Sequence, residues 1–520
     1  MVHQNLFPTG PGKVVPAATT KNNAGGVAYQ RSNEQALAQF AATGCFGNTF
    51  YVKAEEQLSK VLELAQTCDP RFVAQCAIYS RQEGAMKDMP AMLCAVLAMR
   101  DPALLAKVFD LCIDNFKMVR NFVQIIRSGV VGRKSFPRMA RRLIKGWFEK
   151  RTDAQLFHSS IGTQPSMADI IKMVHPKPRD EARRCMLAYL IGRPVASMGL
   201  LPEVVQQFEA FKRGEGPAPD INFQFLSALP LTPEQWKQIA RNATWQTLRM
   251  NLNTFHRHGC FADTALLAHC LKRLQDPAEI AKAKPMPYQL FSAFLHVEDT
   301  MPPGVRMALA QASDAALSNV PDLPANTAVL VDVSGSMSHP VTQDRGSATS
   351  KMRCIDVAAL IACAIVRKNP TARVVPFDTA VHGSTAFMRG SVLDSAKVLA
   401  TYGGGGTNVS IALEHIRTAM PQIELIVVVS DNESWMDSNP YGRGTASMQQ
   451  WRLIQQKNPN AKIVCIDLTP NTSTQLKDEP NVANVGGFSD AVFDFIASFS
   501  STNESWENKI KALALPGEVG

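Results

Sequence analysis

The spacing of apolar residues changes once along this chain of 520 residues, near Asn326, and this change constrains the fold more than any other feature. From about Asn33 to Leu295, apolar residues recur at helical spacing between prolines, which predicts a succession of helices of about 10 to 18 residues. Short helices that cannot each bury an apolar face stack on their neighbours. We therefore expect an irregular helical-repeat domain over residues 31–300, after a polar, flexible arm over residues 1–30.

After Asn326, apolar runs alternate with helical patterns. The expected strands are Ala328–Val333, Arg373–Phe377, Leu425–Ser430 and Ile463–Leu468. The expected helices are Cys354–Arg367, Val409–Met420, Met448–Gln456 and Ala491–Phe499. This alternation predicts a doubly wound α/β domain with a largely parallel sheet over residues 326–506, a connector at 301–325 and a tail at 507–520. Ligands of such sheets bind beyond the carboxyl ends of the strands.

The composition favours a cytoplasmic protein. The eleven cysteines include no CxxC pair, and several fall inside apolar helical patterns, as reduced and buried thiols do. Residues 1–18 lack the apolar core of a signal peptide. The longest apolar stretches, such as Val357–Val366, are well short of the roughly 20 residues that a bilayer requires. We expect neither a disulfide framework nor a membrane-bound chain.

The net charge of +9 belongs to one half of the chain. Residues 301–520 hold 17 Lys or Arg and 20 Asp or Glu, a net charge of −3, which leaves +12 for residues 1–300. A concentrated positive charge favours a polyanionic partner, either nucleic acid or an anionic membrane, although a basic surface that only aids solubility is about as common.

Three segments of the α/β half carry oxygen ligands at predicted strand ends. Asp332, Ser334 and Ser336 form a DxSxS turn after the first strand, Thr407 follows four glycines, and Asp431 ends the Leu425–Ser430 strand. Their carboxylates and hydroxyls suit Mg²⁺, which prefers six oxygens at roughly 2.0 to 2.1 Å. The alternative is that Ser334 and Ser336 only cap the following helix. A phosphate loop is not expected, because no GK[ST] follows the glycines.

The densest basic feature is the segment Arg133–Arg151, which holds eight Lys or Arg and one acid, Glu149. Its apolar residues repeat at helical spacing and should face a core. Arg138, Arg141, Arg142 and Lys145 form a separate stripe at spacing i, i+3, i+4, i+7. Such a stripe suits phosphates, although by itself it fits a solvated face equally well.

A second basic patch, Lys172–Arg179, continues into Arg183 and Arg184. His158 and His175 lie in or near it. No nucleophile, base and oxyanion arrangement accompanies them, and the clustered carboxylates of a two-metal nuclease are missing from the sequence motifs. We therefore expect no enzymatic activity, and we interpret these histidines as solvent-facing residues or RNA contacts.

With both halves considered, the chain resembles the Ro ribonucleoprotein family, in which a TROVE domain precedes a von Willebrand factor A (vWA) domain. In the first half the resemblance rests on Met86–Pro90, Gly132–Trp147, Asp169–Pro178 and Met250–Leu252. In the second half it rests on Val331–Met337, Gly404–Thr407 and Ser430–Glu433, which look like the metal-ion-dependent adhesion site of vWA domains. The similarity extends from about Asn33 to Phe499.

The resemblance implies a ring of HEAT-like helical repeats closed by the vWA domain. It implies Y RNA or Y-like RNA on the outer surface and single-stranded 3′ ends of misfolded non-coding RNA in the central hole. It also implies that the protein acts together with the 3′-to-5′ exoribonuclease polynucleotide phosphorylase, as such proteins do in bacteria. By match to the family motif, His175 would contact Y RNA beside Lys172. Two other family contact positions, basic in animal members, correspond to His158 and Gly162 here, a departure from the family pattern.

These inferences together predict a monomeric, non-enzymatic RNA scaffold with a divalent cation, Mg²⁺ by chemistry, and with neither DNA nor membrane as a partner. The residues expected to bind RNA are Arg133, Lys134, Arg138, Arg141, Arg142, Lys145, His158, Lys172 and His175. Those expected to bind the cation are Asp332, Ser334, Ser336, Thr407 and Asp431. The alternative is a protein-interaction module whose metal site captures an acidic residue of a partner, without RNA.

Overall fold

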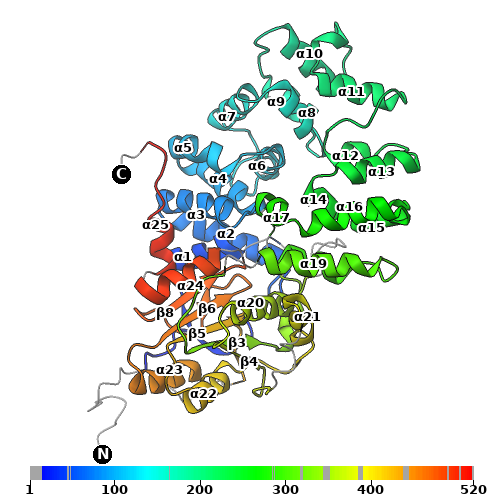
Figure 1. Ribbon diagram of the computed structural model, residues 1–520. Helices are drawn as coiled ribbons and strands as arrows, with labels where there is room; N and C mark the ends of the chain where they lie inside the picture. The colour runs from blue at the N-terminus through cyan, green and yellow to red at the C-terminus, as the bar shows by residue number, and fades with distance from the viewer. Residues whose placement is uncertain are drawn as a thin grey trace, which may run out of the picture. The chain divides into compact units, whose positions relative to one another are not determined.

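The computed structural model describes residues 15–43, 46, 48–162, 164–283, 285, 287–316, 320–342, 352–383, 390–436, 444–488, 491–502 and 505–517 (Figure 1). The chain forms two compact units. The first contains residues 1–85, 286–295 and 313–513, and the second contains residues 86–285, 296–312 and 514–520. Within the described ranges, no helix is long and apolar enough to cross a membrane.

A five-stranded parallel sheet forms the centre of the first unit, with strand order β4-β3-β5-β6-β8. The strands are β3 (Thr327–Asp332), β4 (Arg373–Phe377), β5 (Leu425–Ser430), β6 (Lys462–Asp467) and β8 (Val482–Gly486). Four of them lie within one residue of their predicted positions. β8 was not predicted, because its sequence, Val-Ala-Asn-Val-Gly, has too little apolar content to stand out from a loop.

Helices cover both faces of the sheet, as a doubly wound fold requires. They are α20 (Cys354–Lys368), α21 (Val392–Leu399), α22 (Val409–Ala419), α23 (Ala446–Lys457) and α24 (Ala491–Thr502). Figure 1 shows α22 and α23 on one side and α20 and α24 on the other. Alternate strand residues face opposite helices, so Leu330 and Val428 join the core formed with α22 and α23, which includes the buried Trp451. The predicted α/β architecture is confirmed.

The N-terminal segment corrects the expectation of a flexible arm for residues 15–30, while residues 1–14 of that predicted arm lie outside the described residues. From residue 15 onward it is structured: β1 (Thr20–Lys21) pairs with β2 (Val27–Gln30), and β2 pairs with β7 (Ser473–Thr474). Tyr29 is buried in the same core as the sheet. Its polar composition misled the prediction, because the segment gains its apolar partners from residues far away in the chain.

A buried ion pair fixes this segment. Arg31 donates from Nη2 to Asp467 Oδ2 at 2.5 Å and from Nε to the Ser473 carbonyl at 3.2 Å, and both charged side chains are almost fully buried. Helices α1 (Asn33–Thr43), α2 (Ala54–Thr67) and α3 (Pro70–Gln82) follow in the same unit, and α1 packs on β8. At the C-terminal end, α25 (Trp506–Lys511) packs on α3. These helices therefore belong to the compact unit of the sheet, whereas the sequence placed them with the helical repeats.

The second unit is built from helices. They are α4 (Asp88–Arg100), α5 (Pro102–Cys112), α6 (Phe116–Ser128), α7 (Arg138–Glu149), α8 (Asp153–Ser159), α9 (Met167–Val174), α10 (Glu181–Leu190), α11 (Glu203–Lys212), α12 (Phe223–Leu226), α13 (Pro233–Asn242), α14 (Trp245–Met250), α15 (Leu252–Arg257), α16 (Thr264–Gln275) and α17 (Pro277–Ala283). Next along the chain, α18 (Pro287–His296) belongs mostly to the first unit and α19 (Pro303–Ala316) mostly to the second. Helices near in sequence pack on one another, such as α4 with α5 and α6, and α7 with α5 and α9, which confirms the predicted helical-repeat architecture.

The prolines that divide this unit stand at helix starts. Pro102 and Pro233 occupy the first turn of α5 and α13, where the missing N–H costs nothing. Asp101 caps α5 by accepting from the Leu104 N–H at 2.8 Å, and Ser166 forms a capping box with Asp169 at the start of α9. Local signals therefore define the short helices before tertiary packing adds to their stability.

The buried pair of Arg31 and Asp467 makes a first prediction. Arg31→Ala should destabilise the first unit by about 3–5 kcal/mol, because it leaves a buried carboxylate without its partner. Lys368→Ala is the control, since it breaks only the exposed pair with Asp322 and should cost less than about 1 kcal/mol. Urea unfolding followed by circular dichroism measures both. Equal losses in the two variants would show that the pair does not anchor the N-terminal segment.

Candidate functional site

The DxSxS turn lies at the carboxyl end of β3, as predicted. Asp332 is the last residue of the strand, Ser334 precedes the 3-10 helix Gly335–Ser338, and Ser336 lies within it. All three side chains are buried. Ser334 Oγ and Ser336 Oγ are 3.2 Å apart, and the Ser334 N–H donates to Asp332 Oδ1 at 2.9 Å. Ser334 makes no side-chain cap to the 3-10 helix, so helix capping does not account for it.

The glycine loop that carries Thr407 is held against this turn. The Gly335 N–H donates to the Gly405 carbonyl at 2.9 Å, and the Gly404 N–H donates to the Val333 carbonyl at 2.8 Å. Gly403 has a φ of +77°, and a Cβ there would collide with Val333, so a larger residue would push the loop away. Thr407 Oγ1 is buried and has no hydrogen-bond partner among the described residues, which leaves an oxygen available for a ligand.

Asp431 follows β5 and brings a second buried carboxyl to the same edge. Its Oδ1 accepts from the Glu433 N–H at 3.3 Å, and Ser430 Oγ donates to Asp332 Oδ2 at 2.5 Å. Burial raises the pKa of Asp332 to about 7, with the nearby charge of Asp431 as the next cause. Burial also raises the pKa of Asp431. Two buried carboxyl groups side by side are costly when ionised, and a cation between them would remove that cost.

This donor set fits a hard divalent cation. Among the described residues no group of three His, Cys, Asp or Glu side chains could hold a metal, so any ion here would depend on hydroxyl as well as carboxylate oxygens. Asp332, Ser334, Ser336, Thr407 and Asp431 would hold Mg²⁺, which accepts such oxygens and keeps water at its open positions. When bound, the ion would attract a carboxylate from another molecule.

Further residues around this edge were not among the five predicted ligands, although one of them, Glu433, belongs to the Ser430–Glu433 motif. Glu433 is buried, and burial raises its pKa to about 8, with Asp431 as the next cause. Its oxygens accept from Asn23 Nδ2 at 2.6 Å and from the Ala24 N–H at 3.2 Å. Tyr51 and Ser336 line the same pocket, and burial raises the pKa of Tyr51 to about 12. Asn23 and Tyr51 come from the N-terminal segment, which only tertiary packing brings here.

The predicted basic stripe lies on α7 and is exposed. Arg138, Arg141 and Arg142 are exposed and Lys145 is half-buried, while Ala140, Ile144, Trp147 and Phe148 pack inward. Within the described ranges, none of the four cations has an acidic partner at ion-pair distance. By contrast, Lys150 pairs with Asp110, and Arg151 stacks on Trp147. Arg133 and Lys134 are exposed in the loop before α7.

The second basic patch contains a shallow groove beside α9. Lys172 and His175 are exposed, and His175 ends the helix with a φ of +50°, a strained conformation for a residue other than glycine. The groove has a volume of about 330 Å³. Its lining combines apolar residues with cations and one histidine: Ile171, Pro176, Pro178, Leu187, Ala188, Ile191, Lys172, Arg184, Arg193 and His175.

Arg183 corrects the sequence interpretation of this patch. It is 3% exposed, pairs with Asp153, and donates from Nη1 to the Phe148 carbonyl at 2.9 Å. It therefore fixes the C-terminal end of α7 and is not available to a phosphate. The sequence could not separate it from Arg184, its exposed neighbour.

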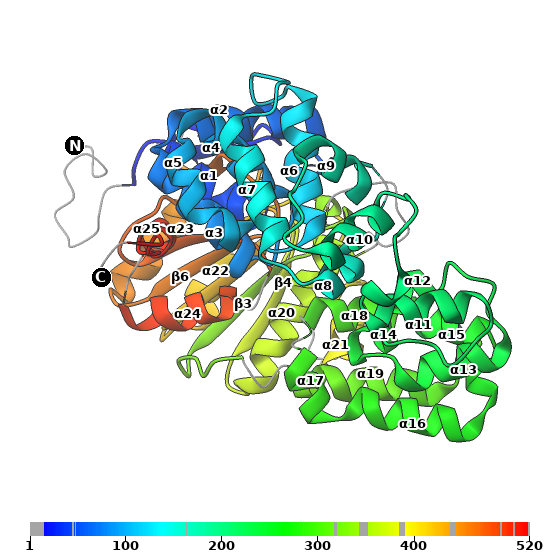
Figure 2. The ribbon, with the colours of Figure 1, turned by 90° about the horizontal axis from the view of Figure 1, so that it is seen from above.

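A third set of cations, on α6, was missed. Lys117, Arg120 and Arg127 repeat at spacing i, i+3, i+10 on the face opposite the buried Val119, Phe122 and Ile126. Figure 2 shows α6, α7 and α9 side by side. The Arg120 guanidinium occupies the space that a Cβ at Gly162 would take. His158 is half-buried on α8 against Phe157. The helical spacing on α6 was readable in the sequence, but its charges are less dense than those of α7.

Comparisons with known proteins agree with this geometry. Residues 326–500 match the family model of the Ro60 vWA domain. The second half of the chain contains a Ro60-type vWA domain. The whole chain is similar to the RNA-binding protein RO60 of Deinococcus radiodurans, with 24% identity covering 92% of this chain and 95% of that protein. The crystal structure of the D. radiodurans Ro (Rsr) protein shares the fold, with a TM-score of 0.60 and 20% identity over 90% of this chain and 99% of that one.

Replacing Asp332 in the cation site of the vWA domain should change the melting temperature in one way without a cation and in another way with Mn²⁺. In cation-free buffer, Asp332→Asn should raise the melting temperature, because it removes one charge from a buried carboxylate pair. Mn²⁺ should raise the melting temperature of the original protein but not of the variant. Asp322→Asn changes an exposed aspartate and should behave like the original protein. Equal stabilisation of both proteins by Mn²⁺ would reject this ligand set.

Ser430 supplies a third prediction, because it orients Asp332 without being a ligand. Ser430→Ala should weaken Mn²⁺ binding by about 10- to 100-fold, the range that supporting hydrogen bonds to metal ligands contribute. Ser338→Ala is the control, since the Ser338 hydroxyl bonds to the Gly335 carbonyl and is exposed. Calorimetric titration with Mn²⁺ measures both affinities. Unchanged affinity in Ser430→Ala would mean that Asp332 is not held in place for a cation.

Proposed function

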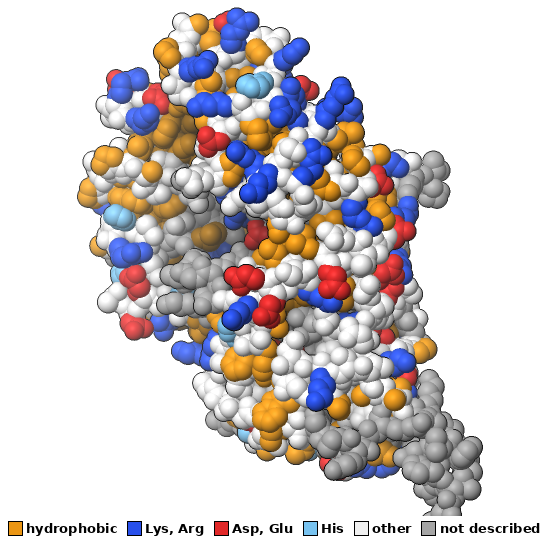
Figure 3. Space-filling model, turned by 180° about the vertical axis from the view of Figure 1, so that it is seen from behind, with side chains coloured by type: hydrophobic (Ala, Val, Ile, Leu, Met, Phe, Trp, Pro, Cys, Tyr) orange, Lys and Arg blue, Asp and Glu red, His pale blue; other side chains and the backbone are white. Residues whose placement is uncertain are grey.

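We propose that this chain is a non-enzymatic RNA-binding protein of the Ro type. The observation that carries the proposal is the exposed cationic stripe of α7, on a helix whose other face is buried. Figure 3 shows Lys and Arg side chains gathered on the upper part of the face in view. The D. radiodurans relative, similar along 92% of this chain, is named an RNA-binding protein and supports the same conclusion.

The chemistry of the two basic regions suggests different contacts. The α7 stripe offers three exposed arginines and the half-buried Lys145, which suits phosphates and does not discriminate bases. The groove beside His175 combines apolar walls with Lys172, Arg184 and Arg193. An unstacked base fits such a wall while its phosphate meets a cation. We propose that Y RNA or Y-like RNA binds across α7, α6 and α9.

The remaining parts of the proposal follow the Ro resemblance. Single-stranded 3′ ends of misfolded non-coding RNA would enter a central cavity, and a 3′-to-5′ exoribonuclease such as polynucleotide phosphorylase would degrade them. The protein would act as a monomer in the cytoplasm. The ten described cysteines are free and buried, which suits a reducing compartment, while Cys45 lies outside the described residues.

The edge of the vWA sheet supports a second candidate function, the capture of a partner protein. Five oxygen-bearing residues meet there, and one of them, Thr407, has a buried hydroxyl without a hydrogen-bond partner among the described residues. A cation held by them would bind an acidic side chain of another protein. This role is compatible with RNA binding, because the two sites lie in different compact units.

Exchanging the two central arginines of the stripe tests the RNA proposal. Arg141→Gln with Arg142→Gln should weaken binding about equally for unrelated single-stranded RNAs. It should also reduce the slope of log affinity against log salt by roughly 0.7 for each phosphate that the variant no longer neutralises. Folding should survive, since Ile144 and Trp147 are untouched. Fluorescence anisotropy with labelled RNA at several salt concentrations measures both effects.

Two further double variants provide a control for this test and a comparison with the second basic region. Arg213→Gln with Lys237→Gln removes two cations that already pair with Glu215 and Glu234, and should leave affinity and slope unchanged. Lys172→Gln with His175→Gln should weaken binding and make it depend less on sequence, because the phosphate contacts of α7 remain. If the α7 variant keeps full affinity and slope while its circular dichroism is intact, the stripe is a solvated face.

A further prediction concerns turnover. The purified protein should not degrade a labelled RNA, whether Mg²⁺ or Mn²⁺ is present, because the motifs assemble no nucleophile and base. Degradation should begin when polynucleotide phosphorylase is added. Metal-dependent cleavage by a homogeneous preparation, lost in Asp332→Asn, would instead make the vWA edge a catalytic site.

A further inference from the structure

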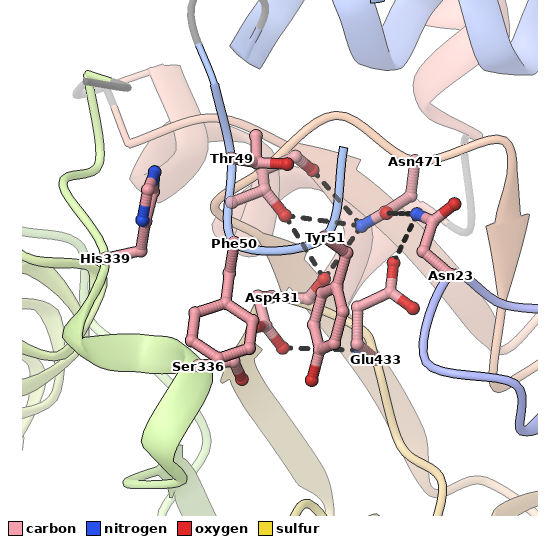
Figure 4. Close-up of a pocket in the computed structure, with 10 residues that line it drawn as sticks. Asn23, Thr49, Phe50, Tyr51, Ser336, His339, Asp431, Glu433 and Asn471 are labelled. Carbon is pink, nitrogen blue, oxygen red and sulfur yellow. Dashed lines mark hydrogen bonds between the residues drawn. The ribbon is translucent and has the colours of Figure 1, made fainter. Parts of the chain in front are cut away.

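The pocket over the cation site is built from separate segments of the first unit (Figure 4). The vWA domain supplies Ser336 and His339 from the turn after β3, Asp431 and Glu433 from the turn after β5, and Thr469 and Asn471 from the loop after β6. The N-terminal segment supplies Asn23 and a run of three residues, Thr49, Phe50 and Tyr51. Residues on either side of α1 thus cover an edge that the rest of the domain would leave open.

The space left in this pocket is small. Its cavity measures about 10 Å³, which is the size of a single water site. A cation liganded by the sheet edge could be accommodated with water, but the carboxylate of a partner side chain needs several times that volume. Figure 4 shows the Tyr51 hydroxyl close to Ser336 and Asp431, while Glu433 points toward Asn23. The Tyr51 side chain, which lines the pocket with Ser336 and Asp431, therefore lies where an incoming carboxylate would have to go.

The two N-terminal contributions differ in how firmly they are held. Asn22 is buried and donates to the Ser434 carbonyl at 2.6 Å, and its neighbours Asn23 and Ala24 donate to Glu433. The second contribution, residues 48–52, is held by fewer contacts. The His339 ring bonds from Nε2 to the Asn48 carbonyl at 2.7 Å, and the Phe50 ring lies 6.5 Å from the His339 ring. Phe50 nevertheless keeps 55% of its surface exposed. Residues 48–52 are therefore the part of the rim that can be displaced at low cost.

We propose that residues 48–52 are an intramolecular cap on the cation site, with the Tyr51 hydroxyl in the position of an external acidic ligand. The site then accepts a carboxylate from a partner protein only when the cap is displaced. The exposed Phe50 offers a partner an apolar contact surface beside the site. A ligand with an apolar residue next to its acidic residue would therefore displace the cap most readily. This inference rests on the cation site proposed above and is independent of RNA binding.

The neighbouring side chains explain why a tyrosine suits this position. Its hydroxyl is neutral and can donate a hydrogen bond toward Ser336 and the carboxyl of Asp431 without adding a third negative charge. It presents a polar group to these buried side chains while no partner is bound. A partner carboxylate would bind a divalent ion far more strongly than a neutral phenol does, so the exchange favours the partner once the ion is present.

The test measures binding of a labelled peptide with one glutamate beside a leucine, at saturating Mn²⁺, by fluorescence anisotropy. Tyr51→Ala should bind this peptide about tenfold more tightly than the original protein, as expected when a closed state that holds about nine-tenths of the molecules is removed. The gain should disappear in chelator and for the same peptide with glutamine. Calorimetry should show Mn²⁺ affinity within about threefold of the original.

Two further variants keep the result decisive if Tyr51→Ala fails to fold. Tyr51→Phe removes only the hydroxyl, and His339→Ala removes the anchor of Asn48, so both should shift peptide affinity in the same direction. Unchanged peptide affinity in the folded variants overturns the cap. Loss of Mn²⁺ binding in Tyr51→Phe also overturns it, because Tyr51 would then be a required ligand. If no protein of the series binds Mn²⁺, the cation site and the cap fail together, while the RNA titration decides the RNA proposal separately.

Discussion

Buried negative charge at the carboxyl edge of the parallel sheet is the constraint around which the first unit is arranged. Asp332 and Asp431 end neighbouring strands, and both are buried. The surrounding residues compensate: Ser430 donates to Asp332, the Glu433 N–H donates to Asp431, and the glycine loop brings Thr407 to the same edge. Further along the edge, Arg31 neutralises Asp467. Without these partners, or a cation, the carboxylates would destabilise the sheet they terminate.

This constraint also explains the position of the N-terminal segment. Its strands pair with β7, its arginine enters the edge, and Asn23 satisfies Glu433. The segment that anchors the fold thus also covers the candidate cation site. Different contacts of this segment stabilise the unit and cover the site. Displacing the weakly held residues 48–52 would therefore open the site and leave the stabilising contacts intact.

In the second unit, the cations of α7 face solvent because the opposite face of this helix is buried. On α7 the aromatic and aliphatic residues fix the helix, and the arginines between them remain free of acidic partners within the described ranges. One cation of the same region, Arg183, is buried among the helices, where it donates a hydrogen bond to the C-terminal end of α7. Arginines of one region therefore have either a structural or a binding role, and their burial decides between the two.

The sequence by itself determined four of the five strands of the parallel sheet, the helical character of the other half and much of the candidate cation site. Strand periods and helical periods are local, and parallel strands place their carboxyl ends at one edge, so the sequence alone grouped Asp332, Ser336 and Asp431. The α7 stripe was readable for the same reason. Only the tertiary structure decided which cations are buried, as Arg183 is, and that Arg120 fills the place of a side chain at Gly162. It alone placed Tyr51 over Ser336, because contacts between residues so far apart in the chain depend on how packed surfaces match, and no local periodicity encodes that match.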